Sequence, residues 1–185
     1  MTHSLYSVPD KWCDLRLKEI ATIIMGQSPP SSTYNESGEG LSFLQGKAEF
    51  GLIYPRPQKY TTKPLKIAEK GDILIAVRAP VGDVNIAPYK IAIGRGLAAI
   101  RPKTNKVDTF YLFYYLQFIK PYLENLGKGS TFKAITKRDL ENLTTVLPPL
   151  DEQRKIARIL YTVDEVIAKT DTIISRVEEL RRALL

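Results

Sequence analysis

Cysteine and histidine are almost absent from this chain, which contains one of each, Cys13 and His3, among its 185 residues. A single cysteine excludes an internal disulfide bond. One cysteine and one histidine cannot supply the four protein ligands of a structural zinc site. Catalysis by a serine–histidine or cysteine–histidine pair would depend on His3 alone, in a terminal segment, so we reject it.

Long apolar runs are missing too. No stretch approaches the ~18 consecutive apolar residues of a membrane span. The N-terminal segment Met-Thr-His-Ser-Leu-Tyr-Ser lacks the basic start and the apolar run of a signal peptide. We therefore expect a cytoplasmic protein with no membrane partner. The hydrophobic fraction of 44% is still sufficient for a core, and the length suits one full-sized domain with an appended helix.

The signatures of nucleotide, nuclease and methyltransferase chemistry are also missing. Gly127-Lys128 is followed by glycine instead of serine or threonine, and Tyr122 replaces the first glycine of a phosphate-binding loop. The turn Gly94-Arg95-Gly96 precedes a strand-like run, not the helix of a dinucleotide site. No acidic residue lies two positions before a lysine, and Asn85-Ile-Ala-Pro has the wrong spacing for an amino-methyltransferase motif. We expect no catalytic residue and no metal ion or cofactor bound by this chain.

The charge of the chain is unevenly distributed. Residues 151–185 contain seven lysine or arginine and seven aspartate or glutamate residues, so the other 150 residues carry the whole net charge of +7. A basic globular part suggests a polyanionic partner, with nucleic acid as the first candidate. Tyrosines and basic residues interleave around Pro55, Pro57 and Pro64. That segment could contact a nucleic-acid backbone or form an ordinary proline-stiffened surface loop.

The apolar pattern of residues 1–147 predicts a mixed-sheet α+β domain. Short apolar runs indicate strands at residues 12–17, 41–44, 73–77, 84–86, 91–93, 97–100 and 144–147. Residues 18–25 could be a short helix running into another strand, which the pattern leaves open. Residues 26–40 and about twenty residues after Lys47 should be irregular because they are rich in proline and polar residues.

Three helical segments are expected in the second half of this domain. The first covers residues 108–118, with Asp108 as its cap. It should bury one broad face made of Phe110, Phe113, Tyr114 and Phe118. A further turn follows at 122–126. A short helix should begin after Thr136, which can form a capping box with Asp139.

The last quarter of the chain predicts one long helix. It follows Leu147-Pro148-Pro149-Leu150, with Asp151 as its N-cap, and no proline or glycine interrupts it. Such a helix would extend roughly 50 Å. Apolar residues recur at steps of four and three, which forms a heptad seam: Ile156, Leu160, Val163, Ile167, Ile174, Val177 and Leu184. A second apolar row runs beside the seam: Ile159, Val166, Ile173 and Leu180.

These apolar rows are wider than a two-stranded seam needs. The helix also greatly exceeds the 11 or 12 residues of an average helix. We therefore expect a spacer or assembly rod that lies in a bundle, or that packs on both a partner helix and a domain. The alternative is an ordinary amphipathic helix folded onto its own domain.

Several segments resemble one known family. Residues 147–157, Leu-Pro-Pro-Leu-Asp-Glu-Gln-Arg-Lys-Ile-Ala, are similar to the signature that opens the conserved helix of type I restriction–modification specificity subunits. Other segments resemble the target-recognition domain of that family: 26–29 (Gly-Gln-Ser-Pro), 43–47 (Phe-Leu-Gln-Gly-Lys), 71–74 (Gly-Asp-Ile-Leu), 78–82 (Arg-Ala-Pro-Val-Gly), 129–131 (Gly-Ser-Thr) and 135–140 (Ile-Thr-Lys-Arg-Asp-Leu). The resemblance covers nearly the whole chain, and the proline-to-glutamine signature is its specific part.

The resemblance implies a DNA target-recognition domain at 1–147 and a spacer and dimerisation helix at 148–185. Such a chain reads one half of a bipartite site in double-stranded DNA and has no catalysis of its own. It positions methyltransferase subunits, which use S-adenosylmethionine, and in the full complex a restriction subunit, which uses ATP and Mg. Family members typically have two recognition domains and two helices. We therefore favour a half-length subunit that forms a homodimer, over a fragment of a longer chain.

Candidate DNA contacts follow from position and chemistry. Backbone amides and a hydroxyl on the glycine-flanked loop could reach phosphate, together with its lysines: Lys128, Ser130, Thr131 and Lys133. Lys137 and Arg138 lie in the first turn of the following helix. Side chains at strand ends could read base edges in the major groove: Gln45, Lys47, Arg78 and Arg95. A solvated surface role is the alternative for each residue.

Two other functions remain open. The chain could be the recognition module of a single-chain restriction–methylation enzyme. It could also be a coiled-coil adaptor that does not bind DNA.

Overall fold

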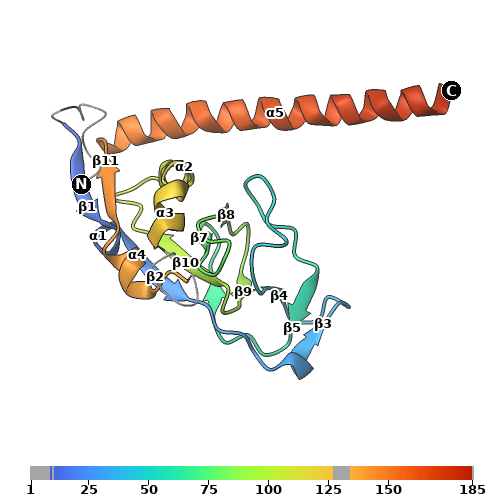
Figure 1. The fold of residues 1–185 in the computed structure, drawn as a ribbon, viewed down its shortest axis with the longest axis horizontal. Helices are drawn as coiled ribbons and strands as arrows, with labels where there is room; N and C mark the ends of the chain where they lie inside the picture. The colour runs from blue at the N-terminus through green and yellow to red at the C-terminus, as the bar shows by residue number, and fades with distance from the viewer. Residues whose placement is uncertain (1–8, 10, 127–133, 185) are drawn as a thin grey trace.

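The computed structural model describes residue 9, residues 11–126 and residues 134–184, without the side chain of Leu184. The candidate contacts Lys128, Ser130, Thr131 and Lys133 lie outside the described residues. Figure 1 shows strands and short helices beneath a long helix, α5 (Leu150–Leu184), which runs over this globular part and projects beyond it. This is the α+β domain with a long C-terminal helix that the sequence predicts.

A four-stranded sheet contains the most apolar segments, in the order β2-β10-β7-β8. Its strands are β2 (Ala21–Met25), β7 (Ile73–Ala76), β8 (Val84–Ile86) and β10 (Leu97–Pro102), each antiparallel to its neighbours. In the centre, Ala99 of β10 lies opposite Ile24 of β2 and Leu74 of β7. Every residue of β7 is buried, because both faces of the sheet are covered, and its sequence is therefore continuously apolar.

A second sheet has five short strands in the order β3-β5-β4-β9-β6. They are β3 (Tyr34–Asn35), β4 (Leu41–Leu44), β5 (Lys59–Thr61), β6 (Ile67–Ala68) and β9 (Ile91–Ile93), and only β4 and β9 pair in parallel among the described pairs. The expectation of irregular structure before β4 and after Lys47 is therefore wrong in part. β3, β5 and β6 depend on pairing with other strands, so their own sequence does not reveal them.

A two-stranded ribbon brings the first strand beside the strand that precedes α5. β1 (Cys13–Arg16) pairs antiparallel with β11 (Thr144–Leu147). β1 leads into α1 (Leu17–Ile20), which β2 follows directly, so residues 18–25 are helix and then strand. A one-turn 3₁₀ helix, η1 (Ser31–Thr33), precedes β3.

Three more short helices complete the domain. α2 (Thr109–Phe118) begins at the predicted cap, since Asp108 Oδ1 accepts from the amide of Tyr111 at 3.0 Å. α3 (Lys120–Leu126) follows it. α4 (Lys137–Glu141) packs near α1 and β2, and its predicted capping box is confirmed, because Thr136 Oγ1 accepts from the amide of Asp139.

The predicted buried face of α2 is wrong in one member. Phe118 is 76% exposed, at the last turn of the helix. The helix lies between α5 and the sheet, so it buries side chains on more than one side: Tyr111, Leu112, Phe113 and Leu116. A helix that is covered on two sides does not have a single apolar stripe. The apolar pattern of α2 therefore predicted burial of Phe118 wrongly.

Apolar clusters lie on both faces of the four-stranded sheet, as the alternation of β7 shows. Ile73 and Ile75 belong to the cluster that includes α1, α2 and the start of α5. Leu74 and Ala76 belong to the cluster with β4 and β9 of the second sheet. Helices therefore cover one face of the central sheet and the second sheet covers the other.

α5 begins at Leu150, two residues before the Glu152 start that an N-cap at Asp151 implies, so the assignment of Asp151 as its N-cap is wrong. Asp151 lies within the first turn and is exposed. The amides of Glu152 and Gln153 donate to the carbonyl oxygen of Pro149, at 2.9 and 3.0 Å. The negative charges of the first turn still favour the helix start through the helix dipole.

Candidate nucleic-acid interface

The ends of three strands meet at one edge of the globular part. The amide of Gly94 donates to the carbonyl oxygen of Leu44 (2.8 Å), and the amide of Gly96 donates to that of Gln45 (3.1 Å). On the other side, the amide of Val77 donates to the carbonyl oxygen of Gly96 (2.9 Å). The end of β4, the turn between β9 and β10, and the end of β7 are therefore in contact. We call the exposed polar residues at these ends the strand-end cluster: Gln45, Arg78 and Arg95.

Glycine is required where these backbones cross. A Cβ atom at Gly26 would lie 2.1 Å from the carbonyl oxygen of Gly94, and one at Gly96 would lie 2.4 Å from that of Gln45. Neither position has room for a side chain. Ser28 adds a polar contact, because its Oγ accepts from the amide of Arg95 (3.2 Å). The glycines thus allow the close approach that holds the backbone of Arg95 in place.

The charges of the two arginines in the strand-end cluster are not neutralised by any residue that the structure describes. Within the described part of the chain, neither Arg78 nor Arg95 forms an ion pair. An arginine guanidinium group can donate one hydrogen bond to O6 and one to N7 of the same guanine. The side-chain amide of Gln45 can likewise form two hydrogen bonds with one adenine. The cluster therefore has the donors and acceptors needed to read base edges.

The first turn of α4 lies at the adjoining edge. Arg78 forms a β-bridge with the segment that leads into α4, and the amide of Ile135 donates to the carbonyl oxygen of Val77 (2.8 Å). Lys137 and Arg138 are both exposed there. The ammonium of Lys137 lies 3.5 Å from the carboxylate of Glu141, one turn on.

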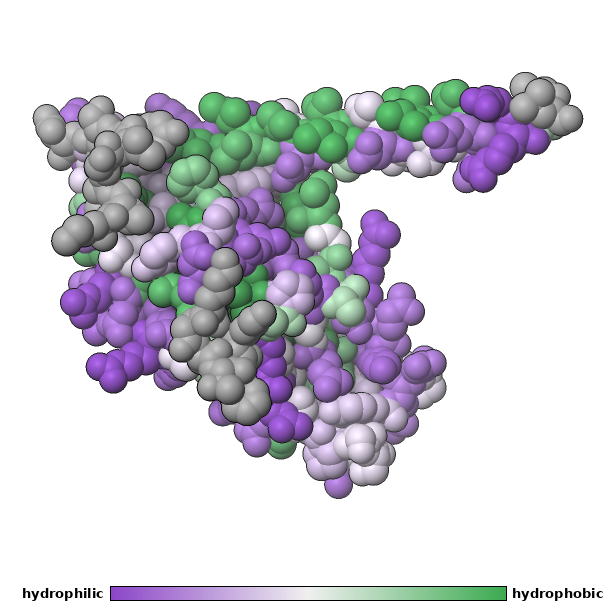
Figure 2. Space-filling model, in the orientation of Figure 1, coloured by the Kyte–Doolittle hydropathy of each residue, from purple (hydrophilic) through white to green (hydrophobic). Residues whose placement is uncertain are grey.

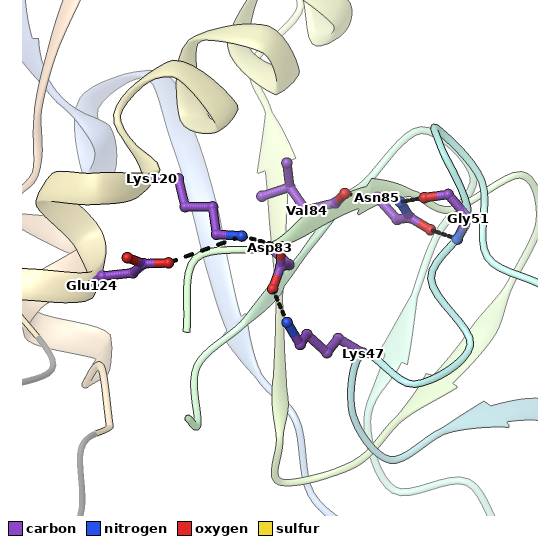
Figure 3. A network of polar contacts seen from close by, with 7 residues as sticks. All are labelled: Lys47, Gly51, Asp83, Val84, Asn85, Lys120 and Glu124. Atoms are coloured by element: carbon purple, nitrogen blue, oxygen red, sulfur yellow. Dashed lines mark hydrogen bonds and ion pairs between the residues drawn. The ribbon is translucent and has the colours of Figure 1, made fainter. Parts of the chain in front are cut away.

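Lys47 is already paired within the domain. It forms an ion pair with Asp83, which also accepts a hydrogen bond from Lys120 Nζ at 2.6 Å (Figure 3). Partial burial alone would raise the pKa of Asp83, but the hydrogen bonds from Lys120 and Lys47 outweigh it and lower the pKa. The bond to Asp83 raises the pKa of Lys120. Asp83 and Lys120 are therefore charged at neutral pH.

Asn85 fixes the segment that follows Lys47. Its side chain is 1% exposed; Oδ1 accepts from the amide of Gly51 (3.0 Å), and Nδ2 donates to the carbonyl oxygen of Gly51 (2.9 Å; Figure 3). Sequence reasoning missed Asp83, Asn85 and Lys120. Their partners lie 34 to 37 residues away in the chain, and no local pattern marks such pairs.

Another set of polar contacts fixes the start of α5 to the domain. Gln153 is 1% exposed, and its Oε1 accepts from the amide of Asp108 (2.9 Å). Its Nε2 donates to the carbonyl oxygens of Pro148 (2.9 Å) and Lys106 (3.3 Å). The glutamine that closes the proline-to-glutamine signature is therefore a buried anchor between α5 and the segment before α2.

Aromatic residues of α2 hold the next turns of α5. Tyr114 Oη donates to Asp164 Oδ2 (2.8 Å), and the rings of Phe110 and Tyr161 pack edge to face with centroids 5.2 Å apart. Burial and the bond to Asp164 raise the pKa of Tyr114, so its phenol keeps the donated proton at neutral pH. All side chains from Glu165 to residue 183 are exposed.

The predicted heptad seam is uncovered beyond the first turns of α5. From Leu160 to Val177 its members are 38–58% exposed, and the second apolar row is 58–65% exposed. Figure 2 shows the apolar side chains as a strip along the side of α5 that faces away from the globular part. The described residues contain no group of His, Cys, Asp or Glu that could hold a metal ion, and no helix among them is long and apolar enough to cross a membrane.

The structure therefore combines a basic α+β domain, with arginine and glutamine at one edge, and a projecting helix with an open apolar strip. Residues 9–179 match the model of the family described as Type I restriction modification DNA specificity domain, and the chain belongs to this family.

Similar proteins and solved structures also point to this family. The chain is 59% identical over 162 residues to the putative type I restriction enzyme MjaX specificity subunit of Methanocaldococcus jannaschii, which covers 86% of this chain and 38% of that protein. It is similar to the HsdS subunit from Thermoanaerobacter tengcongensis, with a TM-score of 0.76 and 47% identity over 90% of this chain and 40% of the other.

A third similar chain comes from a structure described as the structural basis underlying complex assembly and conformational transition of the type I R-M system. The TM-score is 0.83 with 47% identity, over 97% of this chain and 45% of the other. The chain thus spans less than half the length of these relatives.

Proposed function

We propose that the globular part of this chain reads one half of a bipartite site in double-stranded DNA. The observation that carries the proposal is the strand-end cluster, which presents Gln45, Arg78 and Arg95 together on a domain that holds the whole positive charge surplus. These residues would read base edges in the major groove. Lys137 and Arg138 would bind phosphate beside them, as would the segment of Lys128, Ser130, Thr131 and Lys133.

The helix α5 pairs, in this proposal, with the α5 of a second copy. The open apolar strip supports a partner helix, because water contact along such a strip is unfavourable. An antiparallel pair would place two recognition domains at opposite ends of the rods, where they would read an inverted, interrupted site. A parallel pair would bring two chains of charge +7 together at one end, which repulsion disfavours.

In this proposal the chain has no catalysis of its own. It positions a methyltransferase subunit, and in a full complex a restriction subunit, on the DNA site. S-adenosylmethionine, ATP and Mg would be bound by those partners. Family membership and the specificity subunits among its relatives support this role.

A reconstitution experiment tests the proposal. The purified chain should neither methylate nor cleave DNA when S-adenosylmethionine, ATP and magnesium are supplied. Addition of a cognate methyltransferase subunit should give methylation at one defined sequence. Methylation by the chain alone, or methylation by the mixture without sequence preference, would contradict the proposed role.

A further inference from the structure

One carboxylate ties together three parts of the domain that are distant in sequence. Asp83 lies just before β8, Lys47 follows β4, and Lys120 is the first residue of α3 (Figure 3). The side chains of the two lysines are 34% and 36% exposed, and that of Asp83 is 25% exposed. They line an open cavity of about 460 Å³, so DNA phosphate could reach the lysines if the carboxylate did not hold them.

The charges in this cavity do not cancel. Two ammonium groups face one carboxylate at hydrogen-bond distance, and Glu124 lies farther from Lys120, at 3.9 Å. The local net charge therefore still favours a polyanion, while both lysines are oriented toward Asp83. An ammonium released from this pairing would bind any phosphate, because phosphate contacts do not depend on base sequence.

The ion pair between Lys47 and Asp83 is also connected through the backbone to the strand-end cluster. Lys47 lies two residues after Gln45, whose carbonyl oxygen is bonded to the turn that carries Arg95. Asn85 holds Gly51 at the other end of the same segment. The backbone between Gln45 and Gly51 is therefore fixed from both sides, at Lys47 by Asp83 and at Gly51 by Asn85.

We propose that Asp83 is a positioning residue that determines DNA specificity. It holds Lys47 and Lys120 away from the phosphate backbone, and it fixes the segment that presents Gln45. Binding then depends more on base contacts of the strand-end cluster and less on sequence-independent charge. This inference rests on the proposed DNA binding.

The test uses the full chain and two duplex probes, a pool of random sequence and the sequence that the wild type enriches from that pool. Asp83→Asn should bind the random pool more tightly, and the dependence of log Kd on log salt concentration should steepen by about 0.9 for each released lysine. The ratio of the affinity for the enriched sequence to the affinity for the random pool should fall. Asp83→Glu keeps the carboxylate, so its salt dependence and its affinity ratio should be close to those of the wild type.

Two further variants separate lysine release from a general change in charge. Glu49→Gln removes one carboxylate from the same segment without freeing Lys47 or Lys120, and it should leave the salt dependence close to wild type. Lys120→Met should also leave it unchanged, because Lys120 contacts Asp83 and not phosphate. In the Asp83→Asn background, Lys120→Met should remove about half of the added salt dependence.

Circular dichroism shows whether each variant is folded. If Asp83→Asn is folded, an unchanged salt dependence and specificity ratio overturns the inference. If it does not fold, Lys120→Met decides: an unchanged salt dependence supports the inference, and a loss of about 0.9 overturns it. A wild type that binds duplex DNA without enriching any sequence overturns the proposed function, and the inference with it.

Discussion

Arg78 and Arg95 are the two arginines proposed to read bases. Each has an exposed, unpaired guanidinium within the described chain, and backbone contacts hold both in place. Arg95→Ala should therefore weaken binding to the selected DNA site by about 1–3 kcal/mol, the contribution of one good bidentate base contact. Binding to random duplex should change much less. Fluorescence anisotropy with both probes measures the difference.

A matched control for this substitution lies on the projecting helix. Arg176 is exposed on α5, outside the globular part, so Arg176→Ala removes the same side chain away from the proposed interface. It should leave both affinities near wild type. Equal losses for the selected and the random probe in Arg95→Ala would mean that Arg95 binds phosphate and does not read a base.

Gln153 is a buried polar anchor between α5 and the domain. Gln153→Ala leaves the amide of Asp108 and the carbonyl oxygens of Pro148 and Lys106 without their partner. Since a buried polar group without a partner costs ~1–3 kcal/mol, the free energy of unfolding should fall by about 2–4 kcal/mol. Urea unfolding followed by circular dichroism measures this. The neighbour Arg154 is exposed, and Arg154→Ala should change stability by less than about 0.5 kcal/mol.

For single residues, the sequence predicts the location of those that directly follow a recognisable strand. Gln45, Arg78 and Arg95 follow apolar strands, so their place at strand ends can be inferred from the pattern. Asp83 and Asn85 cannot be found this way, because their roles come from contacts with segments 34 to 37 residues away. The buried role of Gln153 is equally hard to predict, since its side chain bonds to Asp108 and Lys106, which lie 45 and 47 residues away.

Some helices and strands of the fold can likewise be predicted from the sequence, and others cannot. Strands with continuous apolar runs, such as β7, and helices with clear caps, such as α2 and α4, agree with the sequence pattern. The strands β3, β5 and β6 do not, because they contain two or three residues each and are stabilised by pairing across the second sheet. The exposed position of Phe118 was also missed, since α2 is covered from two sides.

The pairing of α2 with α5 sets the direction in which the long helix leaves the domain. Asp164 is the last residue of α5 that the domain partly covers, and Tyr114 Oη bonds to it. Tyr114→Phe keeps the ring and removes this bond, so the helix should vary more in direction while stability falls by only about 1 kcal/mol. The exposed Cys13 offers a label site on the domain, and Thr172→Cys offers a second one on α5.

Pulsed electron paramagnetic resonance between spin labels at these two sites measures the spread of distances. Dilution with unlabelled protein suppresses signals between copies. The distance distribution should broaden in Tyr114→Phe. Tyr115→Phe is the control, because Tyr115 bonds to the carbonyl oxygen of Thr144 and not to α5. Equal widths in wild type and Tyr114→Phe would show that other contacts fix the helix direction.

For the whole molecule, the apolar strip of α5 is the feature that a single chain leaves unexplained. Ile167 lies near the middle of the strip and is 48% exposed. Ile167→Asp would bury an unpaired carboxylate in a helix pair, which is strongly unfavourable. We expect a dimer for the wild type and a monomer for Ile167→Asp, by light scattering at matched concentration.

Lys169→Asp provides the matched control for assembly. It introduces the same carboxylate two residues further on, outside the apolar rows. This variant should remain dimeric. A monomeric wild type at concentrations of tens of micromolar, where typical specific homodimers form, would argue against self-pairing. The open strip would then require a helix from a different chain.

Selection of DNA from a random duplex pool by the full wild-type chain is the decisive measurement of whether this protein reads a half-site. We expect enrichment of one short half-site in two inverted copies, separated by a gap of constant length, because two recognition domains would lie at opposite ends of an antiparallel helix pair. We also expect the enriched sequence to be bound much more tightly than the starting pool at physiological salt. Recovery of a pool with no enriched sequence, bound as weakly as the starting pool, would contradict sequence-specific DNA binding by this chain.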